Sequence, residues 1–209
     1  MAKSPVSEKL VIDGAQGSLE ALLETPEGAS RLRIAVLCHP HPQHQGTMLN
    51  KVVHTLARAM NDLGIPALRF NFRGVGASDG EYGGGEGEID DVVAIADYVR
   101  GRWPNADIWL GGFSFGAVVA ARAAARIAPA QLITIAPAIN ILGAKLSEQP
   151  TVAWLIVQGD ADEIVPANDV VEWVDRLDPG PELVLLPGVG HFFHGHLVDL
   201  RRALVANLD

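Results

Sequence analysis

The chain has 209 residues, 48% of them hydrophobic, and carries a formal net charge of −9 at pH 7. This length and composition provide for a substantial core, so we expect one globular domain over residues 1–209 rather than a disordered chain. The acidic balance, which no basic cluster offsets, argues against a nucleic-acid partner and against binding to an anionic membrane surface.

Cysteine usage and the N-terminus bear on location. Cys38 is the only cysteine, which excludes an internal disulfide framework and suits a reducing compartment. Residues 1–5 lack the apolar stretch of a signal peptide, and no run of 18 apolar residues is present that could span a membrane. We therefore expect a cytoplasmic location.

Short segments of alternating or apolar character predict the strands. Residues 8–25 alternate loosely and break at Asp13-Gly14 and Gln16-Gly17, which predicts an N-terminal antiparallel hairpin. Nearly continuous apolar runs follow, as expected of parallel strands that are covered on both faces. These runs are residues 34–38, 67–72, 108–110, 132–136, 152–157 and 183–186.

Amphipathic stretches separate the apolar runs. Apolar side chains recur at helical spacing within residues 48–63, 89–103, 170–177 and 197–204. The alternation of strand and helix predicts an α/β fold built on a doubly wound, mostly parallel sheet. In such sheets ligands bind at the carboxyl ends of the strands. Polar residues follow several of the predicted strand ends, namely residues 39–44, 73–79, 114, 160–162 and 191.

A glycine-flanked serine follows one of these strands. Gly112-Phe113-Ser114-Phe115-Gly116 comes after the apolar run 108–110 and continues into a small-residue helical pattern over residues 117–127. A strand, a serine with glycine two positions away on either side, and a helix are the context of a nucleophile elbow. The tight turn leaves no room for side chains at positions 112 and 116 and strains the serine backbone. We therefore predict that Ser114 is a nucleophile.

A second serine has the same glycine spacing. Ser78 stands in Gly76-Ala77-Ser78-Asp79-Gly80, but it lies several residues beyond its strand. The glycine-rich residues 83–87 follow it rather than a helical pattern, and we interpret them as a mobile surface loop. The context therefore favours a loop serine at this position.

A serine hydroxyl needs a base, and the base needs a carboxylate that orients it. In proteins built around such a nucleophile elbow, the three residues follow the chain order serine, acid, histidine. The loop after the run 152–157 offers Asp162, whereas we expect Asp160 to brace that loop and Glu163 to face solvent. The loop after the last strand offers His191 as the base, and we interpret His194 and His196 as surface or helix-start residues.

An acyl-transfer site also needs two backbone N–H groups that stabilise the oxyanion. We expect one from Phe115, directly after the nucleophile. The other should come from the loop His39-Pro40-His41-Pro42-Gln43, in which the two prolines have no N–H. This leaves His41 or Gln43, of which we favour His41.

The motifs together resemble those of the α/β-hydrolases, in particular small bacterial serine hydrolases near the dienelactone-hydrolase branch. The matching segments are residues 39–42 with 46–51, 73–78, 112–116, 159–162 with 165–166, and 190–191. The likeness extends over residues 8–207 and implies a triad of Ser114, Asp162 and His191. It also implies that residues 73–78 brace the strand before the oxyanion hole. Dienelactone hydrolases have cysteine at the elbow, so their substrate does not carry over.

Residues 139–150 are too few to build the helical lid that many esterases and lipases carry. We therefore expect an open, lidless site that takes small, soluble acyl substrates. The predicted function is hydrolysis of carboxylic esters through an acyl-enzyme intermediate. The same residues would serve a thioesterase, an amidase or an acyl transferase, and a hydrolase scaffold can also host a non-catalytic binding protein.

Other chemistries are less well supported by the sequence. His39, His41 and His44 suggest a metal site, but no carboxylate or cysteine pattern completes the coordination apart from Cys38. Cys38 ends a predicted buried strand and is better interpreted as packing than as a nucleophile. Residues 83–87 lack the Gly-Lys-Ser/Thr ending of a phosphate loop. We therefore expect neither a metal ion nor a cofactor.

Overall fold

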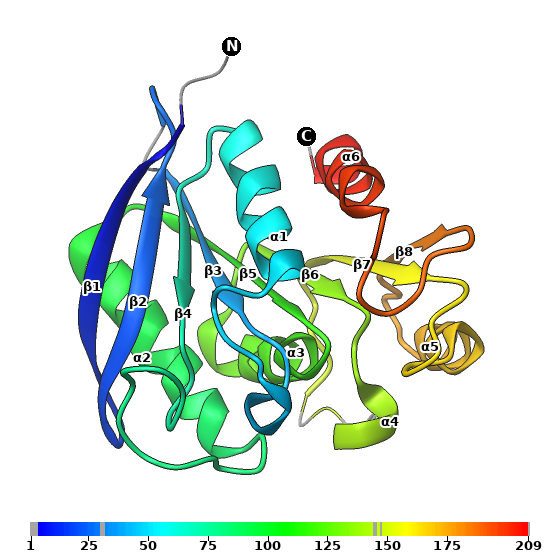
Figure 1. Ribbon diagram of the computed structural model, residues 1–209, viewed down its shortest axis with the longest axis horizontal. Coiled ribbons are helices and arrows are strands. Elements are labelled where there is room, and N and C mark those ends of the chain that lie inside the picture. The colour runs from blue at the N-terminus through cyan, green and yellow to red at the C-terminus, as the bar shows by residue number, and fades with distance from the viewer. Residues whose placement is uncertain (1–3, 30–31, 144–145, 147, 209) are drawn as a thin grey trace.

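The computed structural model describes residues 4–29, 32–143, 146 and 148–208 (Figure 1). An eight-stranded sheet passes through it in the order β1-β2-β4-β3-β5-β6-β7-β8. The strands are β1 (Val6–Gly14), β2 (Gly17–Thr25), β3 (Arg33–Cys38), β4 (Ala67–Phe70), β5 (Asp107–Phe113), β6 (Gln131–Ile135), β7 (Ala153–Gly159) and β8 (Glu182–Leu186). The helices are η1 (Pro42–His44), α1 (Lys51–Asp62), α2 (Gly87–Arg102), α3 (Phe115–Ile127), α4 (Ile139–Leu142), α5 (Ala167–Val174) and α6 (Leu197–Leu208).

The sheet combines an antiparallel hairpin with a parallel body. β1 and β2 pair antiparallel, with Gly14 opposite Gly17 across a two-residue turn, and β2 pairs antiparallel with β4. All the remaining neighbours pair in parallel. The predicted α/β-hydrolase sheet, with its N-terminal antiparallel hairpin, is confirmed.

Helices cover both faces of the sheet, so each face has its own core. α2, α3 and α5 pack on one face, where Val92, Val119 and Trp173 are buried. α1 and α6 lie side by side on the other face, where Leu56 and Leu204 are buried (Figure 1). Burial on both faces explains why the parallel strands are almost continuously apolar.

Among the strands, β5 differs most from its expected boundaries. The apolar run predicted a strand over residues 108–110, but pairing continues through Gly111 and Gly112 to Phe113. Gly111 and Gly112 stand opposite Leu37 and Cys38 of β3, and backbone pairing needs no side chain. The strand therefore delivers its last residue directly to Ser114.

The connection after β6 is short where the structure describes it. It holds the four-residue helix α4 and Gly143, and then the chain passes to β7. Residues 144, 145 and 147 of the predicted connection 139–150 lie outside the described residues. Within the described part of the chain no helix has both the length and the apolar character that a membrane crossing requires.

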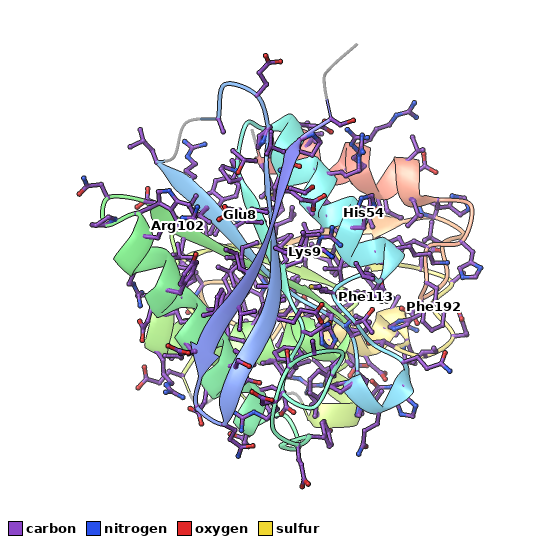
Figure 2. The ribbon with its side chains drawn as sticks, turned by 60° about the vertical axis from the view of Figure 1, so that its left-hand side comes forward. Glu8, Lys9, His54, Arg102, Phe113 and Phe192 are labelled. Atoms are coloured by element: carbon purple, nitrogen blue, oxygen red, sulfur yellow. The ribbon has the colours of Figure 1, made fainter. Side chains whose placement is uncertain are left out.

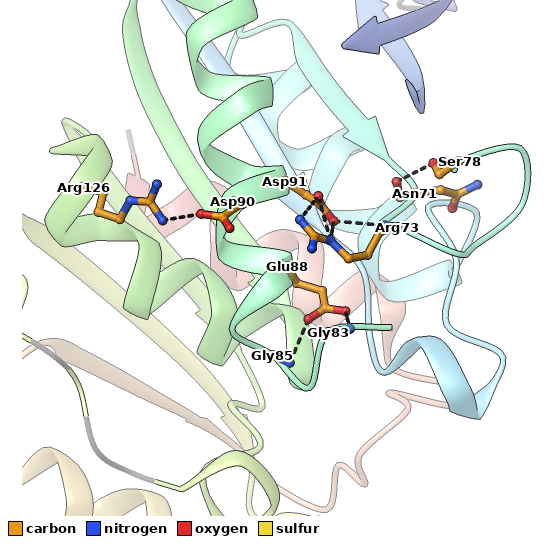
Figure 3. Close-up of polar contacts among 9 residues, drawn as sticks. All are labelled: Asn71, Arg73, Ser78, Gly83, Gly85, Glu88, Asp90, Asp91 and Arg126. Carbon is orange, nitrogen blue, oxygen red and sulfur yellow. Dashed lines mark hydrogen bonds and ion pairs between the residues drawn. The ribbon is translucent and has the colours of Figure 1, made fainter. Parts of the chain in front are cut away.

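A buried ion pair fixes the loop after β4 to α2 (Figure 3). Arg73 places its Nη2 2.7 Å from Asp91 Oδ1, and its backbone N–H donates to Asp91 Oδ2 at 3.0 Å. The neighbouring Glu88 accepts hydrogen bonds from the backbone N–H groups of Gly83 and Gly85, at 2.8 Å each. The glycine-rich segment, which we expected to be a mobile surface loop, is thus bonded to the start of α2.

Replacing Asp91 by Ala should strongly destabilise the fold. The variant leaves the Arg73 guanidinium buried without its partner, and breaking a buried pair in this way costs about 3–5 kcal/mol. Asp90→Ala is the matched control, because Asp90 pairs with Arg126 at a half-exposed position and such pairs contribute about 0–1 kcal/mol. Urea unfolding measures both variants, and equal losses of stability would contradict this account of the buried pair.

Candidate active site

Ser114 occupies a strained turn between β5 and α3. Its backbone has φ 56° and ψ −115°, in a region that residues with side chains rarely adopt. A Cβ added at Gly112 would lie 2.3 Å from the carbonyl oxygen of Gly116, and one added at Gly116 would lie 2.3 Å from that of His39. Both glycines are therefore needed for the chain to make this turn, as the motif predicted.

The structure brings Ser114, His191 and Asp162 together. His191 Nε2 lies 3.1 Å from Ser114 Oγ, and His191 Nδ1 lies 2.8 Å from Asp162 Oδ2. The three residues follow β5, β7 and β8, whose carboxyl ends lie at the same edge of the sheet. All three are buried, with 6%, 7% and 3% of Ser114, Asp162 and His191 exposed. The arrangement can carry a proton from the hydroxyl to the imidazole.

The Asp162 carboxylate receives hydrogen bonds on both oxygens. Oδ1 accepts the backbone N–H groups of Ile164 and Val165, while Oδ2 accepts Gln158 Nε2 and faces His191. Burial by itself raises the pKa of Asp162, but the hydrogen bonds from His191 and from Val165 and Ile164 outweigh it, so the pKa lies below its ordinary value. The carboxylate therefore stays charged at neutral pH.

Sequence reasoning gave no role to several neighbours of the imidazole. The ring of Phe113 lies 5.0 Å from that of His191, and Glu163 Oε2 accepts the His191 backbone N–H at 3.3 Å. Glu163 is exposed, as expected, but it also touches the loop that carries the imidazole. Gln158 could have been noticed as a polar residue within an apolar strand. No sequence signal marks the contact of Glu163, which joins two distant loops.

The side chains of Phe115 and His41, the two residues predicted to supply the oxyanion donors, lie against each other. The Phe115 N–H belongs to the first turn of α3, where backbone N–H groups have no acceptor within the helix. The imidazole of His41 lies 4.8 Å from the Phe115 ring and 5.2 Å from the Tyr82 ring. The Gln43 N–H, the alternative donor, is already bonded to His41 Nδ1 at 3.2 Å.

His39 ties together the loops that follow β3 and β4. Its Nε2 accepts the Phe72 N–H at 3.0 Å, so Nδ1 carries the proton that it shares with the carbonyl oxygen of Pro40 at 2.6 Å. Met48 N–H adds a second link by donating to Asn71 Oδ1 at 2.8 Å. These bonds join the loop after β3 to Asn71 and Phe72, directly before residues 73–78, whose bracing role stays a prediction.

The remaining sequence candidates lie outside this hydrogen-bonded chain. Ser78 bonds to the Asn71 carbonyl and the Glu20 N–H, and Asp160 accepts the Gly188 N–H, so both hold loops in place. Cys38 is fully buried, and burial raises the pKa of its thiol. Among the described residues no group of three His, Cys, Asp or Glu side chains is arranged to hold a metal ion.

The fold is that of the α/β serine hydrolases. The chain belongs to the serine aminopeptidase S33 family, whose model matches residues 32–148. It is similar to an α/β serine hydrolase homologue from Coxiella burnetii, with 46% identity over 97% of both chains and a TM-score of 0.93.

Two further relatives support this assignment. XC6422 from Xanthomonas campestris, an α/β serine hydrolase without a lid, is 43% identical over 100% of this chain and 96% of its own, with a TM-score of 0.92. The uncharacterized protein RP471 from Rickettsia prowazekii is 36% identical over 82% of this chain and 76% of its own. The expected lidless α/β-hydrolase is thus confirmed.

The buried His39 should make stability depend on pH. Burial lowers its pKa from 6.5 to about 4, against the opposing effect of the bond to Pro40. Between these two values the unfolded chain binds a proton at His39 that the folded chain does not. The contribution of His39 to the free energy of unfolding is therefore fully present above pH 6.5 and is lost as the pH falls toward 4. The shift corresponds to a loss of up to about 3 kcal/mol.

His39→Gln tests this dependence while keeping an acceptor and a donor at position 39. We expect the variant to have a lower free energy of unfolding than the wild type at pH 7.5. At pH 4.5 this difference should be smaller by most of the loss of about 3 kcal/mol that the pKa shift of His39 implies. Urea unfolding at intervals between these pH values measures both proteins. Parallel stability profiles would show that the His39 imidazole does not titrate as described.

Proposed function

We propose that the protein is a serine hydrolase that cleaves small, soluble carboxylic esters through an acyl-enzyme intermediate. The observation that carries the proposal is the chain of contacts from Ser114 Oγ to His191 Nε2, at 3.1 Å, and from His191 Nδ1 to Asp162 Oδ2, at 2.8 Å. A cytoplasmic location, which the single buried cysteine suits, is part of the proposal.

In the proposed mechanism Ser114 attacks the acyl carbon while His191 takes the hydroxyl proton. Asp162 holds the imidazole in the tautomer with the proton on Nδ1 and stabilises its positive charge. His191 then gives the proton to the leaving alcohol, which departs as the acyl-enzyme forms. Water repeats the sequence on the acyl-enzyme and releases the acid.

The oxyanion is held by the backbone N–H groups of Phe115 and His41. The N–H of Phe115 has the geometry of a helix N-terminus and the aid of the helix dipole. Of the two donors left open by the sequence, His41 is favoured because the Gln43 N–H already has an acceptor. Removing one such donor typically slows turnover about 10²–10³-fold.

The family supports a second candidate, cleavage of an amide bond, since the matching family model is that of a serine aminopeptidase. Amide hydrolysis would use the same proton transfers and differ in the leaving group, which is then an amine. Parallel assays of an ester and of the amide with the same acyl group decide between the two. We expect the ester to react faster.

Ser114→Ala should lower kcat about 10⁶-fold, because the members of a triad act as a unit. A fluorophosphonate probe should label the wild type at Ser114 and fail to label His191→Ala. Ser78→Ala is the matched control: it changes the second glycine-flanked serine and should leave labelling intact. Mass spectrometry locates the label, and turnover that survives in Ser114→Ala would refute the proposal.

The proposed open site also makes a prediction about chain length. For p-nitrophenyl esters, kcat/KM should be highest for short acyl chains, because a site without a lid offers little apolar surface for a long one. Steady-state kinetics with acetate, butyrate, octanoate and palmitate esters measures this dependence. Activity that rises steeply toward palmitate would be incompatible with a small-substrate enzyme.

A further inference from the structure

A shallow hollow lies next to the loop that carries His191. It has a volume of about 270 Å³ and is lined by Glu163, Gly190, Phe192 and His194. Complete small-molecule pockets usually measure about 300–1,000 Å³. The hollow is therefore suited to one part of a ligand rather than to a whole one.

Phe192 supplies an exposed aromatic surface to this hollow. It keeps 40% of its surface in contact with solvent, although a ring of this size is favoured in a core. Its ring meets the imidazole of His191 edge-on, at 5.1 Å between centroids and 85° between planes, and lies 6.5 Å from the buried ring of Phe113. Figure 2 shows Phe192 outside Phe113, toward the surface of the molecule. The exposed ring is thus fixed beside the proposed base.

Glu163 brings a negative charge to the same hollow. One of its oxygens, Oε2, accepts the backbone N–H of His191 at 3.3 Å. No lysine, arginine or histidine side chain among the described residues forms an ion pair with Glu163. Since a carboxylate and an aromatic face both attract cations, the pair favours a positively charged group over a neutral or an anionic one.

The mechanism indicates which part of the substrate reaches this hollow. His191 must protonate the leaving oxygen, so the alcohol departs beside the imidazole, which also contacts the exposed ring of Phe192. We propose that the hollow binds an ammonium group on the leaving alcohol, which makes amino-alcohol and quaternary-ammonium esters preferred substrates. This inference rests on the proposed ester hydrolysis and specifies its substrate class. Glu163 and Phe192 are specificity-determining residues in it.

Two esters that differ only in charge test the proposal. Acetylcholine and 3,3-dimethylbutyl acetate have the same shape, but only the first carries a positive charge. For the wild type, kcat/KM for acetylcholine should exceed that for the neutral ester roughly three- to tenfold, as expected of an exposed cation–π contact reinforced by a carboxylate. Glu163→Gln should reduce the ratio toward one while its amide oxygen still accepts the His191 N–H. Phe192→Ala should also reduce it.

The ratio of kcat/KM for acetylcholine to kcat/KM for the neutral ester separates this inference from the proposed function. Hydrolysis of the neutral ester by the wild type reports the proposed chemistry, and any general effect of Glu163→Gln on the base changes both esters equally. Asp169→Asn is the matched control, because it removes one exposed negative charge from the start of α5 and should leave the ratio unchanged. A wild-type ratio near one, or a ratio that Glu163→Gln and Asp169→Asn alter equally, would overturn the proposal.

Discussion

The site depends on a close contact between backbones at the end of β5. Gly116 of α3 lies so near the carbonyl oxygens of Cys38 and His39 that a Cβ there would approach them to 2.6 and 2.3 Å. This contact holds the first turn of α3 against the end of β3. It therefore sets the position of the Phe115 N–H relative to the loop that begins at His39. The strained backbone of Ser114 persists because the sheet and α3 fix both of its neighbours.

Charge is the second constraint on the site. A buried carboxylate is stable only when hydrogen bonds replace the water that it loses. Asp162 obtains them from Ile164, Val165, Gln158 and His191, and these donors come from two loops and one strand. Gln158 turns its amide nitrogen toward Asp162 and leaves its own buried oxygen without a partner in the described structure. The orientation of this amide thus serves the carboxylate.

Local patterns were sufficient to predict the strands, the hairpin and the elbow. Apolar runs and glycine positions reflect burial and turn geometry, which each segment encodes by itself. The closeness of Ser114, Asp162 and His191 also follows from sequence, because the carboxyl ends of parallel strands meet at one edge. The catalytic roles of these residues remain predictions.

Other contacts could not be predicted from the sequence, because they join distant segments through side chains. Glu88 bonds to Gly83 and Gly85 and so restrains a segment whose composition indicated mobility. The extension of β5 to Phe113 was missed because glycines carry no hydrophobic signal, although their backbone pairs like that of any residue. The contact of Glu163 with His191 depends on how two loops meet, and no local pattern encodes that.

The position of β8 at the edge of the sheet determines which part of the site opens first. In the part of the chain that the structure describes, β8 is the last strand of the sheet and pairs with β7 alone, and its side chains are partly exposed. Edge strands of this kind unfold locally at a lower free-energy cost than the centre of a fold. The loop that carries His191 follows this edge strand, whereas Ser114 follows β5 in the middle of the sheet. Local opening at this edge would therefore move the proposed base away from the proposed nucleophile while the rest of the fold stays intact.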